Sequence, residues 1–225
     1  MLICFSNRTA LKSALGYSVL IFGLWIIYLA AFYPFVKNNL SFSQRALLNE
    51  SMRFCIFVAP VLLYLKFVAR QEPFRYLRLN TNVSRGVLCG VVVGVIYAAL
   101  SFARALLVLQ DGVAFKPVPF VAWFTSLTVS TLIEEIAFRG FLLQQLERAL
   151  NFWTANVLTA CLFVAIHFPG WLLNGSTLVP GKLFAMANIL FLGLLLGYLL
   201  KRTGSLWSCF ILHAINNLAA IILFG

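Results

Sequence analysis

Two glutamates and an arginine, Glu134, Glu135 and Arg139, lie inside an otherwise apolar run of the chain. An ionised side chain near the centre of a bilayer costs about 2.5 to 3.5 kcal/mol, so such groups are kept where they face a protein interior or a water-filled cavity. A glutamate in such a cavity can take a proton from water or conduct one. The pattern therefore indicates an active site or an ion pathway.

Helical spacing separates the two glutamates. Glu135 and Arg139 lie four residues apart on one face of a helix, whereas Glu134 is turned about 100° from Glu135. We expect Glu135 to pair with Arg139, which lowers the cost of both charges, and Glu134 to face a cavity. The alternative is a structural ion pair with a spare carboxylate near the end of the helix.

Two histidines also fall within apolar runs, His167 four residues after Phe163 and His213 four residues before Asn217. A single histidine in a membrane helix is often only a core residue. Two imidazoles with a carboxylate and an amide suit hydrolysis, because the carboxylate accepts a proton from water and the other groups stabilise an oxyanion. Glu134, His167 and His213 could instead bind a metal ion, although the chain has no HExxH motif.

These residues must be positioned by membrane helices. The chain has 225 residues, of which 62% are hydrophobic and only 10% charged, too few to cover the surface of a soluble domain. Its seven apolar segments are Leu15–Val36, Phe54–Ala69, Gly86–Leu109, Phe120–Leu146, Phe152–Leu173, Leu183–Leu200 and Leu206–Phe224. They predict an all-α, polytopic transmembrane helical bundle of about seven spans, forming one integral membrane domain over residues 1–225.

The net charge of +11 is spread along the chain. Lysines and arginines flank the apolar segments instead of clustering on a polar face, which favours contact with the lipid bilayer and argues against nucleic acid as a partner. With the N-terminus in the cytoplasm, eleven of these residues fall on the inner side and six on the outer side. The positive-inside rule therefore predicts a cytoplasmic N-terminus and an external C-terminus.

Glu134 and His167 can share one site only if they lie at a similar depth in the membrane. Straight, untilted helices would leave Glu134 and His167 at different depths, whereas tilt, or a helix that starts below the bilayer surface, would bring them level. Phe168-Pro169-Gly170-Trp171 follows His167 directly, and its proline and glycine predict a helix break that could shape a substrate entrance.

Three motifs carry a resemblance to a known family. Glu134-Glu135-Ile136-Ala137-Phe138-Arg139 reads as EExxxR, Phe163 to His167 as FxxxH, and His213 to Asn217 as HxxxN. In order and type they resemble the motifs of the CAAX-protease and bacteriocin-processing family of intramembrane endopeptidases. The resemblance covers residues 119–225 and says little about the first three apolar segments.

The resemblance implies a function and a role for each motif residue. The chain would be an intramembrane protease that hydrolyses a peptide bond in a membrane-tethered peptide or protein. Glu134 and His167 would activate the attacking water, and His213 and Asn217 would form the oxyanion hole. Glu135 and Arg139 would support the helix, with Phe163 lining the site.

The resemblance leaves the use of a metal open, because the family has been described both as glutamate-dependent and as metal-dependent. We expect no tightly bound cofactor, since the chain has only two histidines and an amide is a poor zinc ligand. The alternative is a divalent metal such as zinc on Glu134, His167 and His213.

Substrate and location follow from the same resemblance. The short chain is more similar to the prokaryotic members, which implies a prokaryotic inner membrane and a peptide substrate, as in bacteriocin processing, instead of a prenylated one. Two other functions stay open: a non-catalytic binding or immunity scaffold, and an ion-coupled transporter. A transporter of this size often has an internal repeat, and none is visible between the two halves of the chain.

Overall fold

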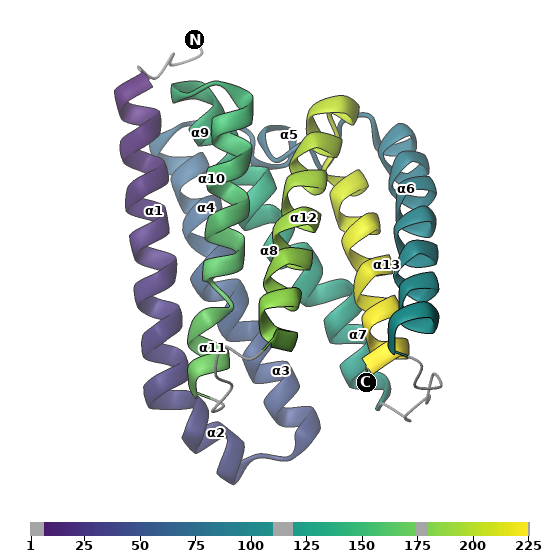
Figure 1. Cartoon of the computed structure of the whole chain (residues 1–225). Helices are drawn as coiled ribbons and strands as arrows, with labels where there is room; N and C mark the ends of the chain where they lie inside the picture. The colour runs from purple at the N-terminus through teal and green to yellow at the C-terminus, as the bar shows by residue number, and fades with distance from the viewer. Residues whose placement is uncertain (1–6, 110–118, 174–179, 225) are drawn as a thin grey trace.

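The computed structural model describes residues 7–109, 119–173 and 180–224, and these form a bundle of helices without a strand (Figure 1). Several helices contain π-helical turns (η). The first long helix consists of α1 (Asn7–Ile27), η1 (Tyr28–Phe32) and α2 (Tyr33–Asn39). The second consists of α3 (Phe42–Arg53), η2 (Phe54–Val58), α4 (Ala59–Leu63) and η3 (Tyr64–Val68). Ser41 and Gln44 form a capping box that starts α3.

A short helix, α5 (Pro73–Tyr76), precedes α6 (Val83–Arg104), which continues as η4 (Ala105–Leu109). The helix that carries the glutamates, here called the motif helix, consists of α7 (Phe120–Phe124), η5 (Thr125–Ser130), α8 (Thr131–Glu135), η6 (Ile136–Leu143) and α9 (Gln144–Ala149). The chain ends with α10 (Phe152–Ala165), α11 (Phe168–Leu173), α12 (Pro180–Thr203) and α13 (Leu206–Phe224).

Six helical runs among the described residues are long and apolar enough to cross a membrane. They are Asn7–Asn39, Phe42–Val68, Val83–Leu107, Phe152–Leu173, Lys182–Thr203 and Leu206–Leu223. The predicted all-α membrane bundle is therefore confirmed, and the protein is an integral membrane protein. The sequence prediction counted one span more, because the motif helix is not among the six: its hydroxyl and charged side chains make it more polar than its neighbours.

The motif helix crosses the bundle obliquely, from α7 near the end of α13 to α9 beside α1 (Figure 1). Every residue of its η6 turn is buried, including Phe138 and Arg139 at 0% exposure. Apolar side chains of the outer helices point outward instead, as Leu15 and Val19 of α1 do. That distribution is typical of a protein whose solvent is lipid, because apolar side chains facing lipid carry no hydration cost.

The two ends of the bundle differ in charge. The start of α1, α5 and the turn between α12 and α13 lie at one end, and the turn between α2 and α3 lies at the other, with the end of α13 (Figure 1). The first end carries Arg8, Lys12, Arg75, Arg78 and Lys201, which are among the eleven basic residues that fall on the inner side when the N-terminus is cytoplasmic. The predicted cytoplasmic N-terminus remains a prediction with which this arrangement agrees.

Small residues let α6 approach α13 closely. Gly86, Gly90 and Gly94 are the buried residues of α6, and a Cβ atom on Gly90 would lie 2.9 Å from the carbonyl oxygen of Ser208 and from Ile211 Cβ. This face has the small-xxx-small spacing that permits close helix packing in membranes.

We predict that Gly90→Leu lowers the Tm of the detergent-solubilised protein, because overpacking a tight contact costs about 1 to 3 kcal/mol. Gly23→Leu is the matched control, since no heavy atom lies within 4 Å of a Cβ at Gly23. Equal Tm values for the two variants in thermal melts would contradict close packing at Gly90.

Candidate functional site

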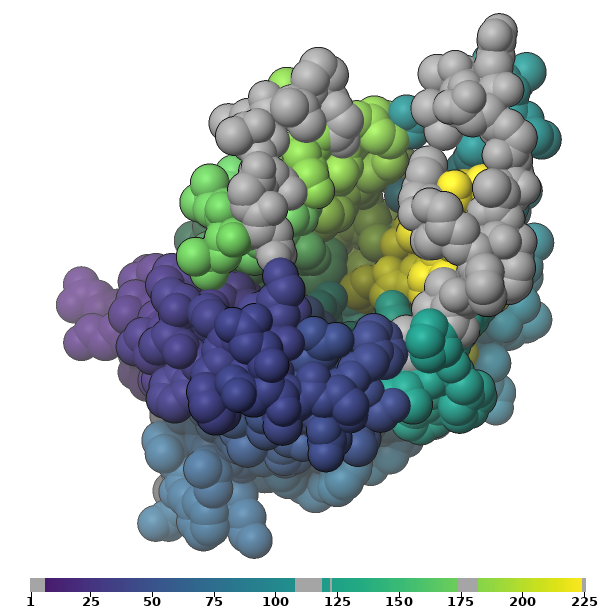
Figure 2. Space-filling view, turned by 90° about the horizontal axis from the view of Figure 1, so that it is seen from below, coloured from purple at the N-terminus to yellow at the C-terminus, as the bar shows by residue number. Residues whose placement is uncertain are grey.

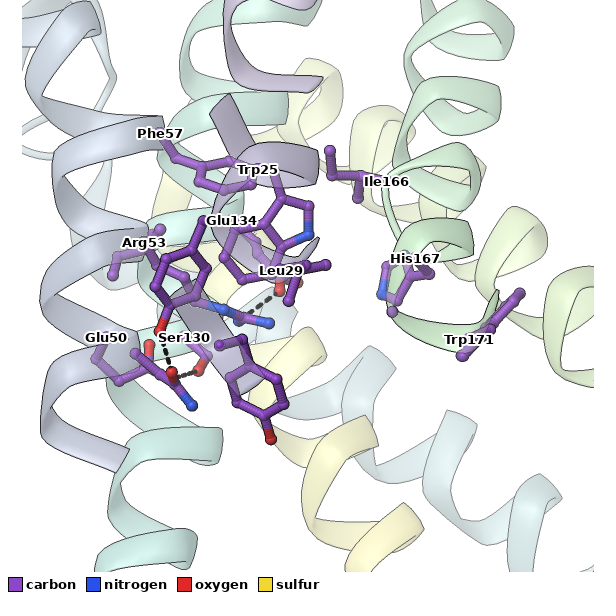
Figure 3. Close-up of a pocket in the computed structure, with 15 residues that line it drawn as sticks. Trp25, Leu29, Glu50, Arg53, Phe57, Ser130, Glu134, Ile166, His167 and Trp171 are labelled. Carbon is purple, nitrogen blue, oxygen red and sulfur yellow. Dashed lines mark hydrogen bonds and ion pairs between the residues drawn. The ribbon is translucent and has the colours of Figure 1, made fainter. Parts of the chain in front are cut away.

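A cavity of about 340 Å³ lies between the first two long helices, the motif helix and the α10–α11 region (Figure 3). The molecule is also hollowed between the first two long helices and the last helices when it is viewed from the end that carries the α2–α3 turn (Figure 2). Most side chains that line the cavity are aromatic or apolar, and a cluster of polar side chains, which includes Glu134 and Arg53, forms one wall. They are Trp25, Tyr28, Leu29, Tyr33, Asn49, Glu50, Arg53, Phe57, Ser130, Ile133, Glu134, Ile166, His167, Gly170 and Trp171.

Glu134 faces this cavity but is not free. Its Oε1 accepts a hydrogen bond from Arg53 Nη1 of α3 at 3.0 Å, and its side chain is 16% exposed. The Arg53 guanidinium carbon lies 5.2 Å from the centre of the Trp25 ring, which helps to fix the cation. Sequence reasoning missed Arg53 as a site residue, although an arginine that interrupts an apolar run is the same signal that identified Glu134.

Glu135 and Arg139 form the predicted pair, and His213 joins it. Arg139 Nη1 lies 3.1 Å from Glu135 Oε1, and both side chains are fully buried. The same Oε1 lies 2.7 Å from His213 Nδ1. Arg139 also lies over the Phe163 ring at 4.2 Å and donates to the carbonyl oxygen of Gly193 at 3.4 Å. Three motif residues thus form one buried network behind the cavity.

The hydrogen bond to Glu135 orients His213. A carboxylate only accepts, so His213 Nδ1 carries a proton and Nε2 points the other way. That Nε2 lies 3.9 Å from Glu134 Oε2. His213 therefore bridges the buried network and the carboxylate at the cavity.

His167 lies on the opposite side of the cavity from Arg53 and Glu134 (Figure 3). Its Nδ1 is 2.7 Å from the carbonyl oxygen of Phe163, which can only accept, so this nitrogen is the donor. The lone pair of Nε2 is then available to a water molecule. Phe163 does not line the cavity; it is buried and packs edge-on against both His167 and His213, with ring centres 5.2 and 5.7 Å apart.

A helix break places His167 at the cavity. α10 ends at Ala165 and α11 begins at Phe168, so His167 lies in the gap between them. The break predicted from Pro169 is confirmed, with the proline inside the first turn of α11, where it needs no backbone donor. Together with the oblique motif helix, this break brings Glu134 and His167 into one cavity. The substrate entrance remains a hypothesis.

Asn217 is directed at the motif helix and does not line the cavity. Its Nδ2 donates to the carbonyl oxygen of Ser126 at 3.2 Å and to Thr131 Oγ1 at 3.0 Å. Both amide hydrogens of Asn217 are therefore engaged, and they hold α13 against the motif helix.

A second carboxylate lies beside Glu134. Ser130 of the motif helix donates to Glu50 Oε1 of α3 at 2.7 Å, and no described residue bonds the buried Oε2 of Glu50. Glu50 lies about one helical turn before Arg53, so one face of α3 places both an acidic and a basic side chain in the cavity. No sequence motif pointed to Glu50.

The donors proposed for a metal do not fit one in this arrangement. In the parts of the chain that the structure describes, no three His, Cys, Asp or Glu side chains gather closely enough to hold a metal ion. Glu134, His167 and His213 are therefore not assembled as a metal site.

Comparison with known proteins gives one match. The model of the Rce1-like type II CAAX prenyl endopeptidase family matches residues 116–219, which contain all three motifs. No curated protein and no solved structure matches the chain. Arg53, Glu50 and Trp25 lie outside the matched region. Over residues 116–219 the chain is therefore similar to the Rce1-like family of type II CAAX prenyl endopeptidases, the CAAX-protease family that its motifs resemble, and this similarity supports an intramembrane endopeptidase.

Proposed function

We propose that this protein hydrolyses a peptide bond in a membrane-tethered peptide or protein, in a prokaryotic inner membrane. The observation that carries the proposal is the position of Glu134 and His167, which come from two motifs on different helices and line the same cavity. The mostly apolar wall of that cavity suits an extended, membrane-derived peptide more than a hydrophilic one.

Glu134 and His167 would act on a water molecule between them. Glu134 accepts a proton as the water oxygen attacks the carbonyl carbon of the peptide bond, which gives a tetrahedral intermediate with an oxyanion, and His167 helps to hold the water. The C–N bond then breaks and the proton passes to the leaving nitrogen. The products are a carboxylic acid and an amine, which together contain all the atoms of the peptide bond and the water, so no other reactant is needed.

His213 is the proposed oxyanion donor. Because Nδ1 already donates to Glu135, His213 donates from Nε2 only as the imidazolium, and this second proton would point toward Glu134 and the reacting carbonyl. We assign Asn217 a positioning role instead of the oxyanion role that the resemblance implies, because its amide hydrogens bond Ser126 and Thr131.

We also propose that Arg53 positions Glu134. By holding Oε1, it leaves Oε2 for water and keeps the carboxylate beside His213. Arg53→Gln is expected to lower kcat/KM by about 10- to 100-fold, the loss of one charge-assisted hydrogen bond. Arg53→Lys should recover part of the rate, which a purely structural role would not predict, and Arg45→Gln on the same helix should change little. An Arg53→Gln enzyme with wild-type kcat/KM would contradict this role.

Cleavage by the purified protein tests the function itself. Wild-type protein is incubated with a panel of membrane-tethered peptides from its own membrane proteome, and the new termini are read by mass spectrometry. A reproducible cut near the membrane surface or within it supports the protease. No cut across the panel favours a binding or immunity scaffold.

The same assay tests our proposal that no tightly bound metal takes part. We expect a chelator to leave the rate unchanged. Loss of cleavage with the chelator that added zinc restores would support the metal-dependent alternative.

A further inference from the structure

A second and larger cavity, of about 630 Å³, lies between α6, α12 and α13. None of its lining residues lines the first cavity. Its wall is mainly small and aliphatic, with Ala185, Ile189, Leu192, Ala219, Ala220 and Leu223. Neither the proposed peptidase reaction nor the three motifs uses this cavity.

Two cations line this cavity at the same level of the membrane. Arg104 lies in the last turn of the span Val83–Leu107, and Lys182 is the first residue of the span Lys182–Thr203. The Arg104 guanidinium carbon lies 3.2 Å from the centre of the Phe184 ring, which holds the charge at the edge of the cavity. Neither cation forms a salt bridge within the described part of the chain.

Polar groups accompany the cations. Ser101, Asn188 and Asn216 line the same cavity and offer hydroxyl and amide groups beside its aliphatic wall. A ligand that fits this combination has an anionic, hydrogen-bonding end and a hydrocarbon end. A peptide without acidic groups fits less well, because it has no anion to pair with Arg104 and Lys182.

We propose that this cavity is a binding site for a phospholipid with an anionic head group. Its phosphate contacts Arg104 and Lys182 at the membrane interface, and one acyl chain lies along the alanines and leucines. The cavity volume is in the range of small-molecule sites in proteins. The lipid also contacts α13 at Asn216, next to Asn217, whose amide bonds the motif helix.

Native mass spectrometry of the detergent-solubilised protein measures the binding directly. Phosphatidylglycerol and phosphatidylcholine with identical acyl chains are added in equal amounts, and the retained lipid is counted. We expect wild-type protein to retain phosphatidylglycerol in preference by a factor on the order of 10, since two basic residues contribute to the attraction. Bound phosphatidylglycerol should also raise the Tm.

Three variants separate the parts of the site. Arg104→Gln/Lys182→Gln should remove the preference for phosphatidylglycerol, and Ala220→Phe should lower retention of both lipids by filling the hydrocarbon end. Lys37→Gln/Arg45→Gln, which removes two charges from the same end of the bundle, should behave as wild type. Since Ala220 is exposed, its variant stays informative if the double variant fails to fold.

Several results would overturn the proposal. Equal retention of the two lipids by wild-type protein would show that the cavity does not select an anionic head group. Unchanged phosphatidylglycerol binding in both folded cavity variants would place the lipid elsewhere. Displacement of the lipid by inorganic phosphate alone would indicate a simple anion site.

Discussion

Glu134→Gln is expected to reduce peptide cleavage by a factor on the order of 10² to 10⁴, the usual contribution of a positioned general base. Glutamine keeps the shape of the side chain, and its carbonyl oxygen can still accept from Arg53 at the position of Oε1. It cannot take a proton from water at neutral pH. The measurement is kcat/KM on the best peptide of the panel, with thermal melts to show that the variant is folded.

Glu147→Gln is the matched control for this substitution. Glu147 lies at the exposed end of the motif helix and pairs with Lys201 at 3.4 Å, away from the cavity. Its variant should cleave at the wild-type rate. If folded Glu134→Gln cleaved as fast as Glu147→Gln, the base would have to be another group, such as His167, and our assignment of Glu134 would be refuted.

Local pairs of the site were predictable because helical periodicity alone places them. Glu135 and Arg139 are four residues apart, and so are Phe163 and His167; in both cases the structure contains a contact across that spacing. The bundle was equally accessible, since apolar runs of about 20 residues form helices in a membrane. The match to the CAAX-protease family confirms the resemblance that the three motifs indicated.

Contacts between distant segments were not predictable. Arg53 reaches Glu134 across 81 residues, and His213 reaches Glu135 across 78. Helical spacing predicts which residues share one face of a helix, but it does not predict which other helix packs against that face. The extra partners changed the interpretation: Glu135 holds His213 as well as Arg139, and Glu134 is already bonded by a cation.

The depth of Glu134 and His167 in the membrane could be predicted only in part from the sequence. Pro169 correctly predicted the break after α10, but the tilt of the motif helix depends on packing against its neighbours. Among the described residues six helical runs meet the length and hydropathy of a span, and the motif helix, which lies inside the bundle, is not one of them. Because its η6 turn is covered by protein, that helix tolerates charged residues that lipid would not.

Arg139→Met should lower the free energy of unfolding by about 3 to 5 kcal/mol, the usual result of removing one partner of a buried ion pair. The guanidinium is fully buried, and its loss leaves the Glu135 carboxylate with His213 as its one hydrogen-bond partner among the described side chains. Thermal melts in detergent measure the effect, and Lys201→Met is the matched control. Lys201 pairs with Glu147 at a half-exposed site, where an ion pair contributes about 0 to 1 kcal/mol.

The double variant Arg139→Met/Glu135→Leu tests why Arg139→Met is destabilising. The penalty comes either from the unpaired charge of the Glu135 carboxylate or from the lost contacts of Arg139. If the penalty of Arg139→Met comes mainly from the uncompensated carboxylate, removing Glu135 as well should restore part of the Tm. The double variant should be inactive, because His213 then loses the acceptor that orients Nε2 toward Glu134. A double variant less stable than Arg139→Met would show instead that Glu135 stabilises the bundle mainly through His213, and the pair with Arg139 would be secondary.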